Sequence, residues 1–220
     1  MQHCFAPRIP SLFLLALAAC ATGSGREDAP EQVDAMVTWI ERVHVEAERG
    51  RQTISDSFER LNVIAAGRFA KEPAAVAYAK FVQSIDLAEQ QAKRFREVVG
   101  PMLSTATPVF AQWQKDVQTI GNERLRQISE MRFSVAKERY DAITKTAVPA
   151  QDQFDGYVKS LRDHAAFLAH DLNATALDEI QAEVKVVAKT ARELDRNMET
   201  CQAAARAFVE QSALPAAPAR

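Results

Sequence analysis

The sequence has little glycine, few aromatic residues and only three cysteines, and these shortages exclude several classes of protein. Seven glycines in 220 residues leave no glycine-rich loop that could cradle a phosphate and no tight turn that could present a nucleophile. Lysine and arginine alternate with acidic residues and never cluster, and the formal net charge is −2. The electrostatic footprint of a nucleic-acid-binding protein is therefore missing. We expect a non-enzymatic protein that binds no nucleic acid.

Long hydrophobic runs are also missing, and the one apolar stretch lies near the start of the chain. Leu12–Ala19 is eight residues long, whereas a helix that crosses a bilayer needs about 20. The single charge of Arg8 before it and the small residues after it are typical of a secretory signal. Leu17-Ala18-Ala19-Cys20 resembles the lipobox of bacterial lipoproteins, in which the cysteine is acylated and becomes the new N-terminus.

This resemblance predicts how the chain is processed and where it resides. We expect residues 1–19 to be a lipoprotein signal peptide and residues 20–30 to comprise the lipidated Cys20 and a flexible tether. The alternative is an ordinary secretory signal that happens to contain a cysteine. Ala21 is not the aspartate associated with inner-membrane retention in the best-known Gram-negative system. The expected location is therefore the cell envelope, lipid-anchored in the outer membrane and facing the periplasm.

The apolar residues after the tether recur about every 3.5 positions, which is typical of helices that pack along one seam. The last long segment keeps this spacing without a slip through Leu177, Ile180, Val184, Val187, Ala191, Leu194, Met198, Cys201, Ala205 and Phe208. Cys201 therefore reads as a small buried apolar residue, although a lone thiol in an oxidising compartment could also pair between chains.

Three further stripes follow the same period. The first runs through Val33, Val37, Ile40, His44 or Val43, Ala47, Arg51, Ile54, Phe58, Leu61 and Ala65. The second runs through Tyr78, Phe81, Ile85, Ala88, Ala92, Phe95, Val99, Met102, Ala106, Val109 and Trp113. The third is less regular and runs through Leu125, Ile128, Val135, Ile143, Phe154, Leu161, Ala165 and Leu168.

Breaks between the stripes predict four helices, over residues 31–71, 74–119, 123–171 and 174–211. Short loops make neighbouring helices antiparallel, so the predicted fold is all-α, an elongated antiparallel bundle of four coiled-coil-like helices over residues 31–212. Pro101, Pro108 and Pro149 should bend two helices, and the alternative is a break near Gly100-Pro101. Asn173 or Thr175 should cap the last helix. Residues 213–220 are rich in proline and alanine and read as a disordered tail.

Candidate metal and catalytic residues are few. Glu41 and His44 have the Glu-x-x-His spacing of di-iron bundles, but the second such motif and the further glutamates are missing. His164 and His170 are six residues apart and share no helix face. Asp163 next to His164 could orient an imidazole as a general base, without any nucleophile to activate. We therefore predict no metal site, no catalytic residue and no cofactor.

Aromatic residues offer two further hypotheses. Trp39, Trp113 and the phenylalanines could line a ligand groove between helices, although their seam spacing is more typical of core. Phe167 and Leu168, beside the third loop, form the exposed contact patch that we would test first.

Two segments resemble a known family. One comprises Val109-Phe110-Ala111-Gln112-Trp113 and Asn122-Glu123-Arg124-Leu125-Arg126, and the other runs from Leu161 to Ala174. They resemble an uncharacterised family, a domain of unknown function in secreted or lipid-anchored helical proteins of Gram-negative bacteria. The resemblance covers about residues 30–212 and is tightest over 109–181, with Ala169 and Asp171 replacing the usual lysine and asparagine. It implies the fold and the compartment, and it carries no activity.

Two functions from different classes fit these observations. The first is a non-enzymatic scaffold or adaptor, anchored by lipid in the periplasm, with an envelope protein or a second copy as partner. The alternative is a binder of a small hydrophobic or lipidic ligand between the helices. Helices that refold on a bilayer rank last, because no long apolar segment follows Cys20.

Overall fold

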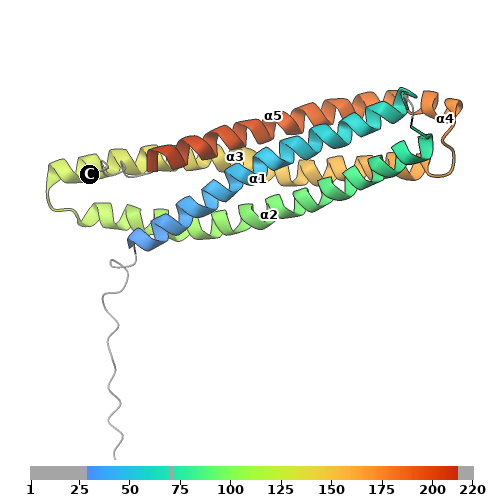
Figure 1. Cartoon of the computed structure of the whole chain (residues 1–220). Helices are drawn as coiled ribbons and strands as arrows, with labels where there is room; N and C mark the ends of the chain where they lie inside the picture. The colour runs from blue at the N-terminus through green and yellow to red at the C-terminus, as the bar shows by residue number, and fades with distance from the viewer. Residues whose placement is uncertain (1–28, 70–71, 213–220) are drawn as a thin grey trace, which may run out of the picture.

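The computed structural model describes residues 29–69 and 72–212, and within these ranges it forms helices and no strand (Figure 1). The helices are α1 (Ala29–Ala65), α2 (Ala74–Thr119), α3 (Glu123–Leu168), α4 (Ala174–Glu179) and α5 (Gln181–Ser212). α1 packs mainly against α2 and α5, and α3 packs against the same two, so α1 and α3 are diagonal in the bundle. The predicted all-α fold of four long antiparallel helices is confirmed, with one short helix added.

The predicted signal peptide, the predicted lipidation site Cys20 and most of the predicted tether lie outside the described residues, as does the predicted tail. Ala29 and Pro30, which we assigned to the tether, are the first residues of α1. Proline fits there because the first turn of a helix has no hydrogen-bond acceptor for its N–H. Within the described part of the chain, every helix is too short or too polar to cross a bilayer.

α1 ends at Ala65 rather than at residue 71, and Gly67 is the reason. Gly67 has a φ of 61°, a left-handed conformation that glycine adopts without strain. Its N–H donates to the carbonyl of Ile64 at 2.8 Å, and the N–H of Arg68 donates to the carbonyl of Val63 at 3.0 Å. These two bonds form a Schellman motif, which satisfies the last carbonyls of the helix. We placed the end at residue 71, just before Pro73, and missed this nearer signal.

The prolines do not break their helices. α2 continues through Pro101 and Pro108, and α3 continues through Pro149. The prediction that both helices remain whole is therefore confirmed. The buried seam continues on both sides of the prolines, for example from Met102 to Val109 in α2 and from Ala147 to Ala150 in α3. Burial of this seam therefore outweighs the backbone hydrogen bonds that proline removes.

A side-chain N-cap precedes the first residue of both α3 and α4. Asn122 accepts a bond from the N–H of Leu125 at 3.1 Å, and Asn173 accepts one from the N–H of Ala176 at 3.0 Å. Asn173 is thus the cap that we predicted as one of two candidates. α3 ends at Leu168, before residue 171, and the predicted single helix over 174–211 is divided at Ile180 into α4 and α5.

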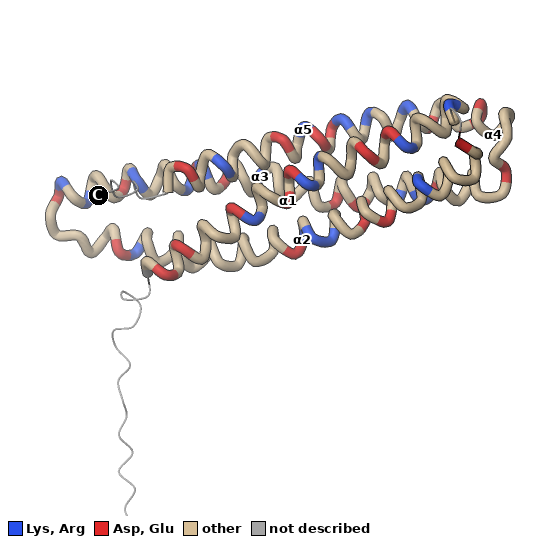
Figure 2. Tube along the Cα trace, in the orientation of Figure 1, with Lys and Arg blue, Asp and Glu red and all other residues tan. Residues whose placement is uncertain are grey.

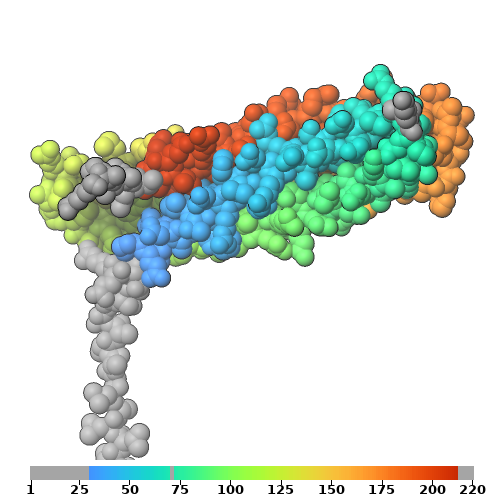
Figure 3. All heavy atoms as spheres, viewed as in Figure 1, coloured from blue at the N-terminus to red at the C-terminus, as the bar shows by residue number. Residues whose placement is uncertain are grey.

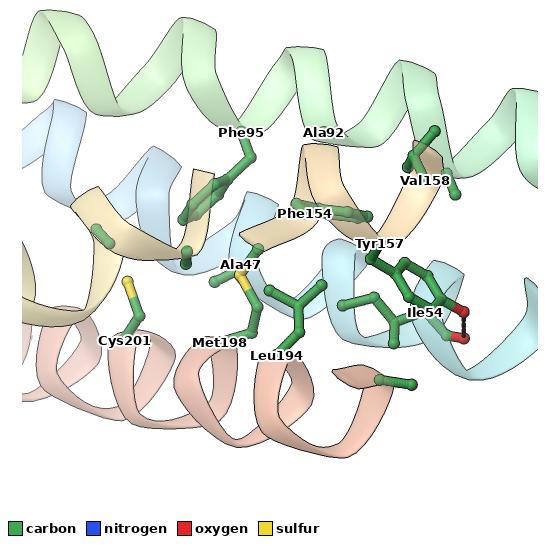
Figure 4. Close-up of a cluster of buried hydrophobic side chains, with 14 of the residues drawn as sticks. Ala47, Ile54, Ala92, Phe95, Phe154, Tyr157, Val158, Leu194, Met198 and Cys201 are labelled. Atoms are coloured by element: carbon green, nitrogen blue, oxygen red, sulfur yellow. Dashed lines mark hydrogen bonds between the residues drawn. The ribbon is translucent and has the colours of Figure 1, made fainter. Parts of the chain in front are cut away.

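The core runs along the bundle as successive layers of side chains from the four long helices. Figure 4 shows Ala47 of α1, Phe95 of α2, Phe154 of α3 and Met198 of α5 meeting in its middle, with Cys201 beside them. Each fully buried large apolar side chain contributes about 1.5–3 kcal/mol. Nine of the ten predicted positions of the last stripe are buried, and Leu177 is partly buried. The predicted burial of Cys201 is confirmed, and its thiol is free.

The seam of α1 differs from the predicted one in three places. Gly50 and Ser57 occupy buried positions, whereas Arg51 and Phe58, which we placed there, lie half-buried at the edge. Val33, predicted as the first position, is 38% exposed. Our apolar count passed over glycine and serine, although small residues let helices approach closely.

The predicted stripe of α3 is wrong in its first third. Leu125, Ile128 and Val135 are 57%, 37% and 37% exposed, while the later members from Ile143 to Leu168 are buried. The α2–α3 hairpin extends past the start of α1 and the end of α5 (Figures 1 and 3), so only two helices meet there. The apolar spacing of α3 thus continues into the hairpin, where neither α1 nor α5 is present to cover the apolar side chains.

Charged residues of both signs line every long helix (Figure 2). Some of them join neighbouring helices: Arg162 of α3 contacts Asp86 and Glu89 of α2, each at 2.6 Å. Arg51 of α1 contacts Asp195 of α5 at 2.8 Å. Both carboxylate contacts raise the pKa of Arg162, and the Asp195 hydrogen bond raises that of Arg51. Exposed pairs of this kind contribute little energy each, so they serve mainly to fix the helix register.

Candidate functional site

A cleft near the loop between α3 and α4 contains Asp163 and His164, two of the candidate residues from the segment Leu161–Ala174. We call it the His164 cleft. Its volume is about 360 Å³, and α3 lines one wall while the α4–α5 junction lines the other. The lining residues are Ser160, Asp163, His164, Phe167, Glu179, Ile180 and Glu183.

His164 is the deepest polar residue of this cleft, with 9% of its surface exposed. Its Nδ1 lies 2.7 Å from the carbonyl oxygen of Ser160, one turn earlier on α3. A carbonyl can only accept a hydrogen bond, so Nδ1 carries the proton and Nε2 holds a lone pair in the neutral ring. Nε2 is buried and has no hydrogen-bond partner among the described residues. An unsatisfied buried acceptor costs about 1–3 kcal/mol.

The rim of the cleft is acidic. Asp163, Glu179 and Glu183 contribute carboxylates, and Lys159 neutralises one of them by contacting Asp163 at 3.0 Å. Phe167, 45% exposed, adds an apolar wall. The cleft therefore suits cationic or amphipathic groups at its rim, whereas the sealed Nε2 is out of reach of a ligand in this conformation.

The candidate pairing of Asp163 with His164, considered for a general base, is not formed. His164 bonds to the Ser160 carbonyl, and Asp163 bonds to Lys159. Adjacent residues on a helix point about 100° apart, which explains why the two side chains diverge. The predicted Phe167–Leu168 patch is half right, because Phe167 is exposed while Leu168 is 1% exposed and belongs to the core.

The other histidine candidates are held by ordinary contacts or lie apart. Nδ1 of His44 lies 3.1 Å from the carbonyl oxygen of Gln202 on α5. His170 is exposed after the end of α3. In the described ranges, no three His, Cys, Asp or Glu side chains are grouped so that they could hold a metal ion.

Some of the predicted aromatic positions, Trp113, Phe110 and Phe133, form a cluster at the α2–α3 hairpin. Trp113 stacks with Phe110 at a centroid distance of 6.5 Å and meets Phe133 edge-on at 5.7 Å. Its Nε1 donates to the hydroxyl of Ser129 at 3.3 Å. A small apolar groove of about 160 Å³ lies between Trp113 and Val33 of α1. Trp39, six residues after Val33 on α1, lies outside this cluster, and the guanidinium carbon of Arg42 is 4.4 Å from its ring centroid.

Sequence reasoning missed Ser160, Glu179 and Glu183 as neighbours of His164. Ser160 and Phe167 are seven residues apart, the spacing of one helix face, and this signal was available. Glu179 and Glu183 could not be placed, because the break at Ile180 sets which face of the last helix approaches α3.

Comparison with known families agrees with this architecture. The sequence model of a family described as "Protein of unknown function (DUF2959)" matches residues 29–212. This range contains all the helices that the structure describes. The chain belongs to this family, and the resemblance to a family of unknown function is confirmed at that level. No curated protein and no solved structure matches the chain.

Proposed function

We propose that this member of the DUF2959 family is a non-enzymatic scaffold or adaptor, tethered by a lipid on Cys20 to the outer membrane and facing the periplasm. Its partner is another protein of the envelope or a second copy of the chain, which it binds through the outer faces of its helices.

The shape of the bundle is the observation that carries this proposal. α2 and α3 have 46 residues each, which corresponds to a length of about 69 Å. A rod of this length with one continuous core presents extended side faces and separates its two ends. These are the properties of a spacer or adaptor, and they are well matched to a short lipid tether at one end.

The composition of the surface supports the same proposal. Mixed charges cover the helices (Figure 2), and apolar side chains such as Val186, 58% exposed, and Phe167 stand among them. Protein interfaces typically combine isolated apolar anchors with a polar surrounding. The carboxylates of Asp163, Glu179 and Glu183 lie at the rim of the His164 cleft, where they can contact the surface of a partner protein.

The alternative, a ligand held between the helices, finds less support. Phe95, Phe154 and Met198 fill the middle of the described core (Figure 4), so a ligand there would have to displace them. The groove beside Trp113, about 160 Å³, is smaller than the usual drug-sized pocket of about 300–1,000 Å³. The His164 cleft, about 360 Å³, reaches that range, but the carboxylates at its rim do not suit a hydrophobic or lipidic ligand.

Lipid labelling and crosslinking in intact cells test the two halves of the proposal separately. An alkyne-bearing fatty acid should label the full chain and should fail to label Cys20→Ala, while the control Cys4→Ala keeps its label. Amine-reactive crosslinking should then join the exposed Lys93, Lys159 or Lys189 to an envelope protein or to a second copy. An unlabelled, freely soluble chain refutes the anchor, and a labelled chain without protein crosslinks refutes the adaptor function.

A further inference from the structure

The first part of α3 projects beyond the end of α5. Nδ2 of Asn197 on α5 donates to Oε1 of Gln153 on α3 at 2.7 Å, which fixes the register of these antiparallel helices. Both rise about 1.5 Å per residue, so Ser212 comes level with about residue 138 of α3. Residues before this level belong to the hairpin that extends past α5 in Figures 1 and 3.

The side of α3 that faces α5 can be followed by its seven-residue repeat. Gln153 bonds to α5, and Ser160 and Phe167, seven and fourteen residues later, line the His164 cleft with the α4–α5 junction. Seven residues before Gln153, Thr146 lies beside Cys201 of α5, close enough for its hydroxyl to lower the pKa of that thiol. Steps of seven in a coiled-coil-like helix stay on one face.

Continuing these steps past the end of α5 leads to an uncovered face. The same row continues through Arg139, Arg132 and Leu125, and the neighbouring row of Asp163 continues through Val135 and Ile128. We call these five residues the free α3 face. Arg139 lies level with the last turn of α5, and the other four residues lie beyond it, where no described helix continues the α3–α5 interface.

The free α3 face is both apolar and basic. Leu125, Ile128 and Val135 are 57%, 37% and 37% exposed. Arg132 and Arg139 are exposed and form no ion pair with any residue that the structure describes. By contrast, nearby Arg126 and Lys137, which lie outside this face, pair with Glu123 and Asp141. Two unpaired cations, Arg132 and Arg139, therefore stand among the exposed apolar side chains of this face.

We propose that the free α3 face binds an amphipathic helix of another protein, which lies in line with α5 and extends the four-helix arrangement. The face spans about 21 Å, so a partner helix of about four turns covers it. That helix carries apolar residues at three- and four-residue spacing over Leu125, Ile128 and Val135, and acidic residues opposite Arg132 and Arg139. This inference names the partner of the proposed adaptor function and rests on it.

A second copy of the chain fits the face less well. Pairing two such faces about a twofold axis places Arg132 against, or close to, Arg132 of the other copy. Like charges brought together across an interface are strongly unfavourable. An acidic helix meets the same two arginines with opposite charge.

Site-specific photo-crosslinking in cells tests the proposal. The full chain carries p-benzoylphenylalanine in place of Ile128, and a matched variant carries it in place of Ser134. Ser134 is also exposed on the hairpin, but it lies three heptads before Asp155, which pairs with Arg96 of α2, and so it faces another way. The adducts are digested, and the crosslinked peptide is sequenced by mass spectrometry.

The proposal expects the Ile128 variant to crosslink to an acidic, amphipathic helical segment of another protein, and the Ser134 variant to lack this adduct. The double substitution Arg132→Glu and Arg139→Glu should reduce the adduct by at least about tenfold, with an unchanged melting curve because both side chains are exposed. Adducts only with a second copy, with residues 213–220, with lipid, or with nothing overturn the proposal. If the lysine crosslinks described above persist in that case, the adaptor function stands and this docking site is wrong; if they are also missing, both fail.

Discussion

The hydroxyl groups of Ser57 on α1 and Tyr157 on α3 lie 2.9 Å apart in the centre of the core, and both residues are completely buried. Each hydroxyl has one proton. Ser57 donates its proton to the carbonyl of Thr53 at 2.7 Å, and Tyr157 shares its proton between the Ser57 oxygen and the carbonyl of Ile54, which lies 3.1 Å away. This pair links the two diagonal helices of the bundle. Burial raises the pKa of Tyr157 well above its ordinary value, so the hydroxyl stays protonated and available as a donor.

Removing either hydroxyl should therefore cost little, and the two costs should not add. Tyr157→Phe leaves Ser57 bonded to Thr53, and Ser57→Ala leaves Tyr157 bonded to Ile54, so each should lower the free energy of unfolding by about 1 kcal/mol. Urea unfolding of both single variants and the double variant measures their coupling. Strict additivity would show that the two hydroxyls do not interact.

Gly50 and Gly156 should respond oppositely to the same substitution. A methyl group at Gly156 meets no neighbour within 4 Å, so Gly156→Ala should stabilise α3 by about 1 kcal/mol through helix propensity. At Gly50 a Cβ atom would lie 3.3 Å from Phe154 and 3.5 Å from Met198. Gly50→Ala should therefore gain less, and Gly50→Val should lose about 1–3 kcal/mol by overpacking. Thermal unfolding of the three variants measures these changes in stability. An equal increase in stability for Gly50→Ala and Gly156→Ala would contradict the close packing at Gly50.

Cys201 should be inert in the folded protein. Burial raises the pKa of its thiol from 9.0 to about 11. In a chain that begins at residue 21, where Cys201 is the only cysteine, iodoacetamide should react after unfolding in urea and not before. Rapid modification of the native chain, or a disulfide-linked dimer on a non-reducing gel, contradicts the burial.

The same thiol predicts a loss of stability at alkaline pH. Between pH 9 and pH 11 the unfolded thiol ionises while the native one stays protonated, so the native state binds more protons and stability falls as the pH rises. The full effect is about 2–3 kcal/mol. Cys201→Ala should flatten part of the fall in the melting temperature between pH 9 and pH 10, while Tyr140 and Tyr157, whose pKa values burial also raises above 10.0, contribute the remainder. An unchanged slope would show that another group is responsible.

His164 should be dispensable for folding. His164→Leu removes the unpartnered Nε2 and loses only the bond to the Ser160 carbonyl, so the free energy of unfolding should stay constant or rise by about 1 kcal/mol. His44→Leu is the control, because it removes a bond from α1 to the Gln202 carbonyl of α5 and should be destabilising. A loss of more than about 1 kcal/mol for His164→Leu would mean that a buried water or another partner satisfies Nε2.

The long helices and most of the core could be predicted because each helix buries one face, which places apolar residues at regular spacing. The unbroken spacing from Ile180 to Phe208 and the continuous seam of α2 follow from burying one face of a helix. The seam of α1 was harder, because Gly50 and Ser57 occupy buried positions that an apolar pattern does not mark. At those positions the neighbours, Phe154 and Tyr157, decide which small residue fits.

Helix ends and uncovered faces could be predicted less well. Gly67 carries a local signal for the end of α1, whereas the division at Ile180 has none that we recognise in the sequence. The exposure of Leu125, Ile128 and Val135 depends on where α1 and α5 stop relative to the hairpin. The sealed Nε2 of His164 likewise depends on the packing of α4 and α5 across it, which periodicity does not encode.

The extended, side-by-side arrangement of the helices is the claim from which the rest follows, and small-angle X-ray scattering of residues 29–212 measures it most directly. A rod about 70 Å long and about 25 Å wide has a radius of gyration of about 22 Å, whereas a globular domain of this size has one of about 16 Å. We expect the larger value, with a distance distribution that peaks early and declines over a long tail. A radius near the smaller value, with a symmetric distribution, would contradict the bundle described above.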